Sequence, residues 1–130
     1  MPHLTELKNC ILLVEDDEAV RRSLQLLLQS CGYDVRAYPS AVHLAHDPVA
    51  LSCGCIIADL MMPQTDAIQL LAEFKAMAWE GISILISGFL DAQWEERARA
   101  AGFDAVLAKP ISNSVLVRTI EQLLPKQTSG

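Results

Sequence analysis

The chain lacks the patterns of a membrane protein or an exported protein. No apolar run approaches the roughly 20 residues that span a bilayer, and no basic segment followed by an apolar one opens the chain as a signal peptide would. Basic residues are also scarce: 10 Lys and Arg stand against 16 Asp and Glu, which gives a formal net charge of -6. Since affinity for nucleic acid comes from clustered cations, we expect a cytoplasmic protein that binds neither membrane nor nucleic acid directly.

A cysteine-based metal site is missing as well. Cys53 and Cys55 are separated by one residue, but no second Cys/His pair has matching spacing. All four cysteines lie within or beside apolar segments. We therefore expect reduced, buried thiols without a metal at Cys10, Cys31, Cys53 and Cys55.

What the chain does have is enough apolar sequence for one core. Its 130 residues are 52% hydrophobic and 20% charged, which fits a single compact domain and leaves little room for a second. We expect an N-terminal extension at residues 1–8, one domain at residues 9–124, and a tail or the start of a linker at residues 125–130.

Short apolar runs alternate with helical patterns along the whole chain. Continuous apolar strands between helices are typical of a parallel sheet covered on both faces. The sequence therefore predicts an α/β fold with a single doubly wound sheet of five parallel strands, at Cys10–Val14, Tyr33–Ala37, Cys55–Ala58, Ile82–Ile86 and Ala105–Leu107.

The helical segments between the strands are marked with different clarity. The first has an apolar stripe that ends at Gly32, and Leu26 falls opposite that stripe, so its side chain should face solvent or a partner. The second is weak because Pro48 interrupts it. Asp66 and Ser112 are expected to cap two of the later helices.

Polar residues follow four of the five predicted strands: Glu15, Asp16 and Asp17 follow the first, Asp59 the third, Ser87 the fourth and Lys109 the fifth. In an open parallel sheet, sites form in the crevice outside the carboxyl ends of the strands. Two carboxylates ~4 Å apart repel by about 4 kcal/mol at an effective dielectric constant of 20, so a cation is needed. Mg²⁺ fits better than Zn²⁺, because no His or Cys lies at these ends.

This set of residue types suits phosphoryl chemistry. A carboxylate beside Mg²⁺ can attack phosphorus and form an aspartyl phosphate. The phosphoryl oxygens then need a metal, a cationic side chain and a hydroxyl donor, and Lys109 and Ser87 supply the last two. Asp17 and Glu18 are instead expected to cap and charge the first turn of a helix.

Four motifs carry a family resemblance: "ILLVEDDEAVRRSL", "IIADLMMP", "ILISGF" and "LAKP", with 44 residues from 15 to 59, 28 from 59 to 87 and 22 from 87 to 109. With them, residues 9–124 resemble the receiver domain of bacterial two-component response regulators. The resemblance implies the flavodoxin-like strand order 2-1-3-4-5. It also implies a phosphoacceptor switch rather than an enzyme, catalysing at most its own phosphorylation and dephosphorylation.

The resemblance assigns the acidic residues. It implies that Asp59 accepts the phosphoryl group and that Glu15 and Asp16 form the acidic pair that holds Mg²⁺ with it, Glu15 acting through water. The backbone carbonyl of Met61, two residues after Asp59, corresponds to a further metal ligand of the family.

The resemblance also assigns a switch, with two departures from the family pattern. Ser87 corresponds to the hydroxyl that turns to the phosphoryl group, Lys109 to the cation that pairs with it, and Pro110 to a cis Lys-Pro peptide. Val106 stands where relatives commonly have a mobile aromatic side chain. Ala67 stands where they usually have Gly, so the loop there is either strained at positive φ or shaped differently.

The resemblance implies partners and leaves rival functions to test. A histidine kinase or phosphotransfer protein would donate the phosphoryl group, and a downstream protein or an attached output domain would read the result, with a phosphorylation-dependent dimer left open.

The rival functions are a receiver-like scaffold that is never phosphorylated and a receiver cut from a longer regulator. A flavodoxin-type module is disfavoured because acids after the first strand would repel a cofactor phosphate. A metal-dependent phosphatase is disfavoured because it would need an Asp-x-Asp pattern there.

Overall fold

The computed structural model describes residues 9–62, 65–88 and 91–124 of the chain. The predicted extension at residues 1–8 and the predicted tail at residues 125–130 lie outside these residues. No helix within the described part is long and apolar enough to cross a membrane.

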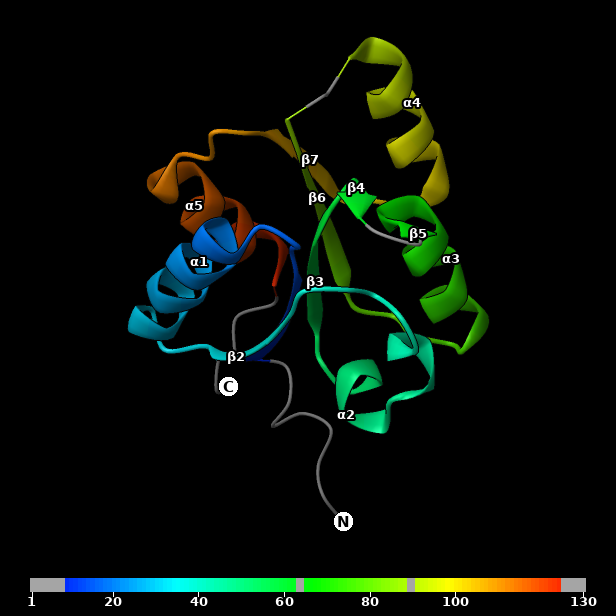
Figure 1. The fold of residues 1–130 in the computed structure, drawn as a ribbon, viewed down its shortest axis with the longest axis horizontal. Coiled ribbons are helices and arrows are strands. Elements are labelled where there is room, and N and C mark those ends of the chain that lie inside the picture. The colour runs from blue at the N-terminus through cyan, green and yellow to red at the C-terminus, as the bar shows by residue number, and fades with distance from the viewer. Residues whose placement is uncertain (1–8, 63–64, 89–90, 125–130) are drawn as a thin grey trace.

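A five-stranded parallel sheet forms the centre of the molecule (Figure 1). Its strands lie in the order β2-β1-β3-β6-β7, which is the order 2-1-3-4-5 when only these five are counted along the chain. The predicted fold class and strand order are confirmed, and each strand is within one residue of its predicted bounds: β1 (Cys10–Val14), β2 (Asp34–Tyr38), β3 (Cys55–Asp59), β6 (Ile82–Ser87) and β7 (Ala105–Ala108).

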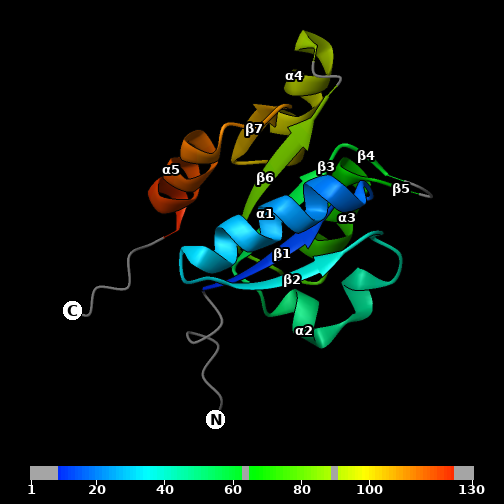
Figure 2. The ribbon, with the colours of Figure 1, turned by 60° about the vertical axis from the view of Figure 1, so that its left-hand side comes forward.

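Helices cover both faces of this sheet (Figures 1 and 2). One face carries α1 (Glu18–Ser30) and α5 (Asn113–Leu123). The other carries η2 (Leu44–His46), α2 (Pro48–Leu51), α3 (Ala67–Ala76) and α4 (Ala92–Ala101). A small antiparallel pair that the sequence did not predict, β4 (Met61–Met62) and β5 (Thr65–Asp66), lies between β3 and α3.

Alternation along the strands divides the core in two. Ile11 and Leu13 of β1 lie on the face of the sheet that α1 and α5 cover, where they pack with Leu28. Leu12 and Val14 of the same strand lie on the face that α3 covers. All four β1 side chains are fully buried. A strand buried on both faces explains why the sequence shows a continuous apolar run rather than alternation.

Local signals in the sequence fix several helix boundaries. The side chains of Asp17, Asp66 and Ser112 accept backbone N–H groups at the starts of α1, α3 and α5, as expected of N-caps. Leu26 is 60% exposed, which confirms its predicted position opposite the buried stripe of α1.

The second helical segment differs from the prediction. Pro48 does not interrupt a helix; it opens the four-residue helix α2, with Asp47 as its N-cap. Proline fits the first turn of a helix because the backbone N–H that it lacks has no partner there. The segment divides into two short pieces at Asp47, whose extended backbone (φ -99°, ψ 114°) ends η2 and precedes Pro48. His43, just before η2, has φ of 67°.

The cysteine prediction is wrong for three of the four residues. Cys10 and Cys53 are joined as a disulfide, and Cys31 is exposed at the end of α1. Only Cys55 is a buried free thiol, and burial raises its pKa. No cysteine belongs to a metal-binding cluster among the described residues.

The departure at Ala67 is resolved in favour of a differently shaped loop. Ala67 is the first residue of α3, is fully buried, and does not have positive φ. Its backbone N–H donates to the carbonyl of Leu60 at 3.1 Å. The chain therefore enters α3 at Ala67 in ordinary helical conformation, without the left-handed backbone for which a glycine would be needed at that position.

Ala78, just after α3, offers a stability test. Its φ is 65°, a left-handed conformation that costs a residue with a Cβ about 1–2 kcal/mol. We expect Ala78→Gly to raise the free energy of unfolding by about 0.5–1 kcal/mol in urea denaturation. Ala72→Gly, at an exposed position inside α3, is the matched control and should lower it by about 1 kcal/mol. A loss of stability in both variants would contradict the account of Ala78.

Candidate phosphoacceptor and metal site

Three acidic side chains converge at the carboxyl ends of β1 and β3. Val14 and Ala58 are paired in the sheet, so Glu15 and Asp59 come next on neighbouring strands. One carboxylate oxygen each from Glu15, Asp16 and Asp59 lies within 4.8 Å of the other two. We call these three residues the acidic pocket. Glu15 and Asp59 are buried and Asp16 is exposed, so the pocket opens to solvent on one side.

Lys109 joins two members of the acidic pocket. Its Nζ lies 2.9 Å from Glu15 Oε1 and 2.9 Å from Asp59 Oδ2. The end of β7 is held beside β6 because the Lys109 backbone N–H donates to the carbonyl of Ser87 at 2.8 Å. The Lys109–Pro110 peptide bond that follows is cis.

The Glu15 carboxylate is only partly satisfied. Its Oε2 accepts the backbone N–H of Asp17 at 3.0 Å. Its Oε1 is buried and, apart from the ion pair with Lys109, makes no hydrogen bond within the described part of the chain. Burial raises the pKa of Glu15, and the negative charge of Asp59 raises it further. Together these two effects outweigh Lys109 and the Asp17 amide, which both lower that pKa. The pocket thus disfavours its own negative charge.

The ammonium of Lys109 is stabilised by the same surroundings. Burial lowers its pKa, but the hydrogen bonds and negative charges of Glu15 and Asp59 raise it more, so the net shift is upward. Lys109 therefore stays cationic at neutral pH. One ammonium faces three carboxylates, which leaves room for a further cation.

The remaining predicted residues lie around this pocket. Ser87 ends β6, is 1% exposed, and follows directly after Ile86, the partner of Asp59 in the sheet. Met61 lies in β4, two residues beyond Asp59. Val106 is a half-buried residue of β7 that packs on the α3 side of the sheet. The carboxyl ends of β1, β3, β6 and β7 thus bring together Glu15, Asp16, Asp59, Ser87 and Lys109 at one edge of the sheet, whereas Met61 lies in β4 and Val106 lies within β7.

Arg21 is a contributor that the sequence reasoning missed. Its Nη1 donates to the backbone carbonyl of Glu15 at 2.9 Å and so anchors the turn between β1 and α1. The available signal was position: Arg21 is one helical turn after the N-cap Asp17, and long side chains on a helix point back toward its N-terminus.

The donor set fits a magnesium ion. Carboxylate oxygens are the ligands that Mg²⁺ prefers, and it binds through one or two of them while keeping several waters. Oε1 of the buried Glu15 has the Lys109 ammonium as its partner and retains a second lone pair that can accept from a further group. The acidic cluster is consistent with the metal-binding active site of a receiver.

Magnesium should therefore stabilise the chain. At ten times its Kd, a ligand of the folded state adds about 1.4 kcal/mol, which corresponds to a rise in Tm of about 5 °C at this chain length. We expect this rise for the unaltered chain in calorimetry and its loss in Asp16→Asn. Asp17→Asn is the matched control because Asn caps a helix as well as Asp does. An equal rise in Asp16→Asn and the unaltered chain would contradict the site.

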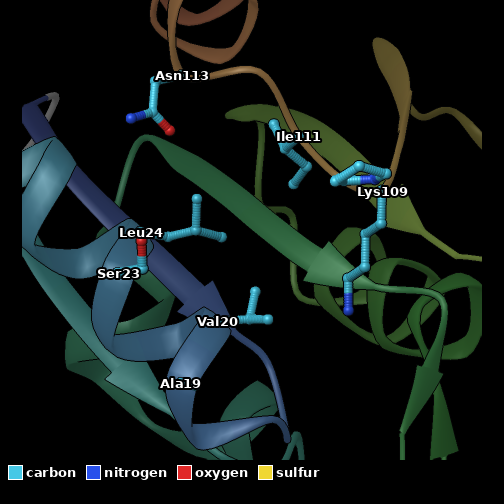
Figure 3. A pocket seen from close by; sticks show the side chains of 8 residues that line it. Ala19, Val20, Ser23, Leu24, Lys109, Ile111 and Asn113 are labelled. Carbon is cyan, nitrogen blue, oxygen red and sulfur yellow. The ribbon is translucent and has the colours of Figure 1, made fainter.

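An apolar groove adjoins the acidic pocket (Figure 3). It has a volume of about 490 Å³ and lies between α1 and the segment after β7. We call it the α1–β7 groove. It is lined by Ala19, Val20, Ser23, Leu24, Lys109, Pro110, Ile111 and Asn113. Lys109 lines the groove and also reaches the acidic pocket, so the two surfaces are continuous.

Comparison with known proteins gives this site its context. The family model described as "Response regulator receiver domain" matches residues 11–121. The chain belongs to that family. Receivers are phosphoacceptor switches of two-component signal transduction rather than enzymes, and a pocket formed by Glu15, Asp16 and Asp59 is typical of those that accept phosphate.

Individual relatives support the assignment. The receiver is 30% identical over 128 residues to response regulator protein TmoT of Ectopseudomonas mendocina, covering 96% of this chain and 58% of that protein. It is 32% identical over 117 residues to transcriptional regulatory protein FixJ of Bradyrhizobium diazoefficiens, covering 90% and 57%. A crystal structure described as FixJ-N has a TM-score of 0.77 at 30% identity and covers 88% of this chain and 91% of its own. The chain thus spans just over half the length of these curated relatives.

Proposed function

We propose that this receiver accepts a phosphoryl group on Asp59 from a histidine kinase or phosphotransfer protein, with Mg²⁺, and thereby switches a protein-interaction surface. The observation that carries the proposal is the placement of one carboxylate between other acids and a lysine. Asp59 lies within 4.8 Å of Glu15 and Asp16 and is paired with Lys109 at 2.9 Å. Such a carboxylate is held in place with a cation beside it before any donor arrives.

Glu15, Asp16 and Asp59 would hold the metal, together with the backbone carbonyl of Met61. When bound, Mg²⁺ neutralises charge on the phosphoryl oxygens. The exposure of Asp16 provides the open side through which a hydrated ion would enter. Glu15, which is fully buried, is better placed to hold a water of the ion than to move toward it.

The chain's own residues divide the transfer between them. An oxygen of Asp59 attacks phosphorus, the new O–P bond forms, and the bond to the donor breaks, with its electron pair leaving on the donor atom. Lys109 is already 2.9 Å from Oδ2 of Asp59, so its ammonium can pair with a phosphoryl oxygen without crossing the pocket. Ser87, at the adjoining strand end, would donate its hydroxyl hydrogen to another phosphoryl oxygen.

The added group would change the surface beyond the pocket. A phosphoryl group brings roughly -1.5 to -2 charge, which draws Ser87 and Lys109 toward it. The backbone of β7 is tied to Ser87 through Lys109, so the shift would pass to the surface of α4, β7 and α5. A downstream protein or an attached output domain would read it, by itself or through a phosphorylation-dependent dimer, in the cytoplasm. An output domain would account for the greater length of the relatives.

The donor protein would contact the α1–β7 groove. Any protein that brings a phosphoryl group to Asp59 has to contact the surface beside the acidic pocket. The groove is part of that surface, because Lys109 lines the groove (Figure 3) and pairs with Asp59. A mostly apolar depression next to a charged centre suits a partner whose apolar residues flank its phosphorylated side chain.

A small-molecule phosphodonor tests the proposal without the cognate kinase. We expect the chain to gain the mass of one phosphoryl group when incubated with acetyl phosphate and Mg²⁺, and to gain none when the metal is chelated. Size-exclusion chromatography of the same samples reports whether the phosphorylated chain dimerises. No mass gain under any metal condition would favour the unphosphorylated scaffold.

A further inference from the structure

Cys10 and Cys53 meet on the α3 side of the sheet although 43 residues separate them. Cys10 begins β1, and Cys53 lies two residues before β3. Their Cα atoms are 4.8 Å apart, within the range of about 4.4–6.8 Å found for disulfides. Both residues are 2% exposed. The backbone therefore holds the two side chains where a bond between them can form.

The backbone carbonyls of both cysteines accept hydrogen bonds. The N–H of Gly54 donates to the carbonyl of Cys10 at 3.1 Å. The indole Nε1–H of Trp79 donates to the carbonyl of Cys53 at 2.8 Å, in a buried hydrogen bond. Neither contact involves a sulfur atom, so neither is lost when the bond between the sulfurs opens.

Cys53 also has a partner for its reduced form. Its Sγ lies 3.7 Å from the carbonyl oxygen of Val49 in α2, in hydrogen-bond geometry. Only a thiol carries the hydrogen that such a contact needs. The sulfur thus has Cys10 as its partner in the disulfide and the Val49 carbonyl within reach as the acceptor for a thiol.

We propose that Cys10 and Cys53 form a redox-responsive site that a peroxide closes to a disulfide and a thiol reductant opens. One sulfur attacks a peroxide oxygen, the O–O bond breaks, and a sulfenic acid and one water form. The second sulfur then displaces the hydroxyl group as a second water. Two thiols and one hydrogen peroxide thus give one disulfide and two waters, and two electrons pass to the peroxide.

Burial decides which products form. Because the two sulfurs are 2% exposed, small reagents such as hydrogen peroxide and dithiothreitol reach them far faster than a bulky disulfide such as oxidised glutathione does, and the bond stays within the chain. Cys31 is exposed and reacts with reagents of any size. Cys55 is fully buried, and its raised pKa keeps it as the unreactive thiol.

The disulfide would set stability rather than phosphoacceptance. It joins the amino ends of β1 and β3, whereas the acidic pocket lies at their carboxyl ends. Closing a loop of 43 residues restricts the unfolded chain, which should raise Tm by roughly 10 °C. Oxidation would thus stabilise the receiver and leave the residues around Asp59 unchanged.

Thiol counting on the full chain tests the site. Samples treated with hydrogen peroxide or with dithiothreitol are denatured and alkylated with N-ethylmaleimide, then digested and sequenced by mass spectrometry. We use Cys31→Ser so that the exposed thiol forms no bond between chains. One adduct, on Cys55, and a Cys10–Cys53 linked peptide are expected after peroxide, and three adducts after dithiothreitol. The oxidised sample should also melt about 10 °C higher.

Cys53→Ala separates the disulfide from other effects of peroxide. In the Cys31→Ser background it should give two adducts after dithiothreitol, no linked peptide after peroxide, and the same Tm after both treatments. Three adducts after peroxide, a linked peptide that contains Cys55 in place of Cys53, or equal Tm values for the oxidised and reduced Cys31→Ser chain would each overturn the proposal. Labelling by acetyl phosphate is measured on the same samples and should be equal in both redox states, so this test and that of phosphoacceptance fail independently.

Discussion

Asp59→Asn is expected to abolish phosphoryl transfer from acetyl phosphate to the chain. The amide lacks the nucleophilic carboxylate oxygen on which the transfer depends. The substitution keeps the shape of the side chain and removes one of three clustered negative charges, so the fold should not be weakened. Intact mass spectrometry measures the result, and the expected occupancy is below the detection limit.

The matched control is Asp17→Asn, two residues from Glu15. Asp17 is exposed and serves as the N-cap of α1, a role that Asn fills equally well. It should be labelled like the unaltered chain. Labelling of Asp59→Asn at the level of this control would mean that another residue is the acceptor.

Gly81→Ala is expected to lower the free energy of unfolding strongly. A Cβ at this position would lie 2.3 Å from the Trp79 ring and 2.5 Å from the carbonyl oxygen of Gly54. Neither neighbour can give way freely, because Trp79 is held by its hydrogen bond to Cys53 and Gly54 O accepts the N–H of Ile82 at 3.0 Å. We expect the free energy of unfolding to fall by about 3 kcal/mol in urea denaturation.

Gly88→Ala is the control for this effect. A Cβ there meets no atom of the described chain within 4 Å, so the free energy of unfolding should change by less than about 0.5 kcal/mol. If Gly81→Ala were as stable as Gly88→Ala, the close packing of Trp79 over this turn would be refuted.

The sheet and its site could be predicted because local and long-range signals agree. Strands such as β1 are buried on both faces, which leaves a continuous apolar run in the sequence. In β1 and β3 the first polar residues come at the carboxyl end, so Glu15 and Asp59 mark both the end of a strand and the place of the pocket. The parallel arrangement then brings residues 44 positions apart in the sequence to the same edge.

Other features depend on contacts that no local pattern records. The Cys10–Cys53 pair arises from the register of β1 beside the turn before β3, and neither cysteine has a spacing that predicts the other. Arg21 anchors the carbonyl of Glu15. In the sequence, however, Arg21 looks like any other charged residue on the solvent-exposed face of a helix. The left-handed turn at His43 precedes η2, and although His is among the residue types enriched at positive φ, a single such residue does not predict a turn.

The identity of the phosphorylated residue is the most direct test of the account. Borohydride reduces an acyl phosphate, so an aspartyl phosphate becomes homoserine, whereas unmodified carboxylates are unchanged. Peptide sequencing by mass spectrometry of the chain treated with acetyl phosphate, Mg²⁺ and then borohydride should find homoserine at position 59 alone, and none when Mg²⁺ is chelated. Homoserine at position 16 or 17, or at position 59 regardless of the metal, would contradict the account.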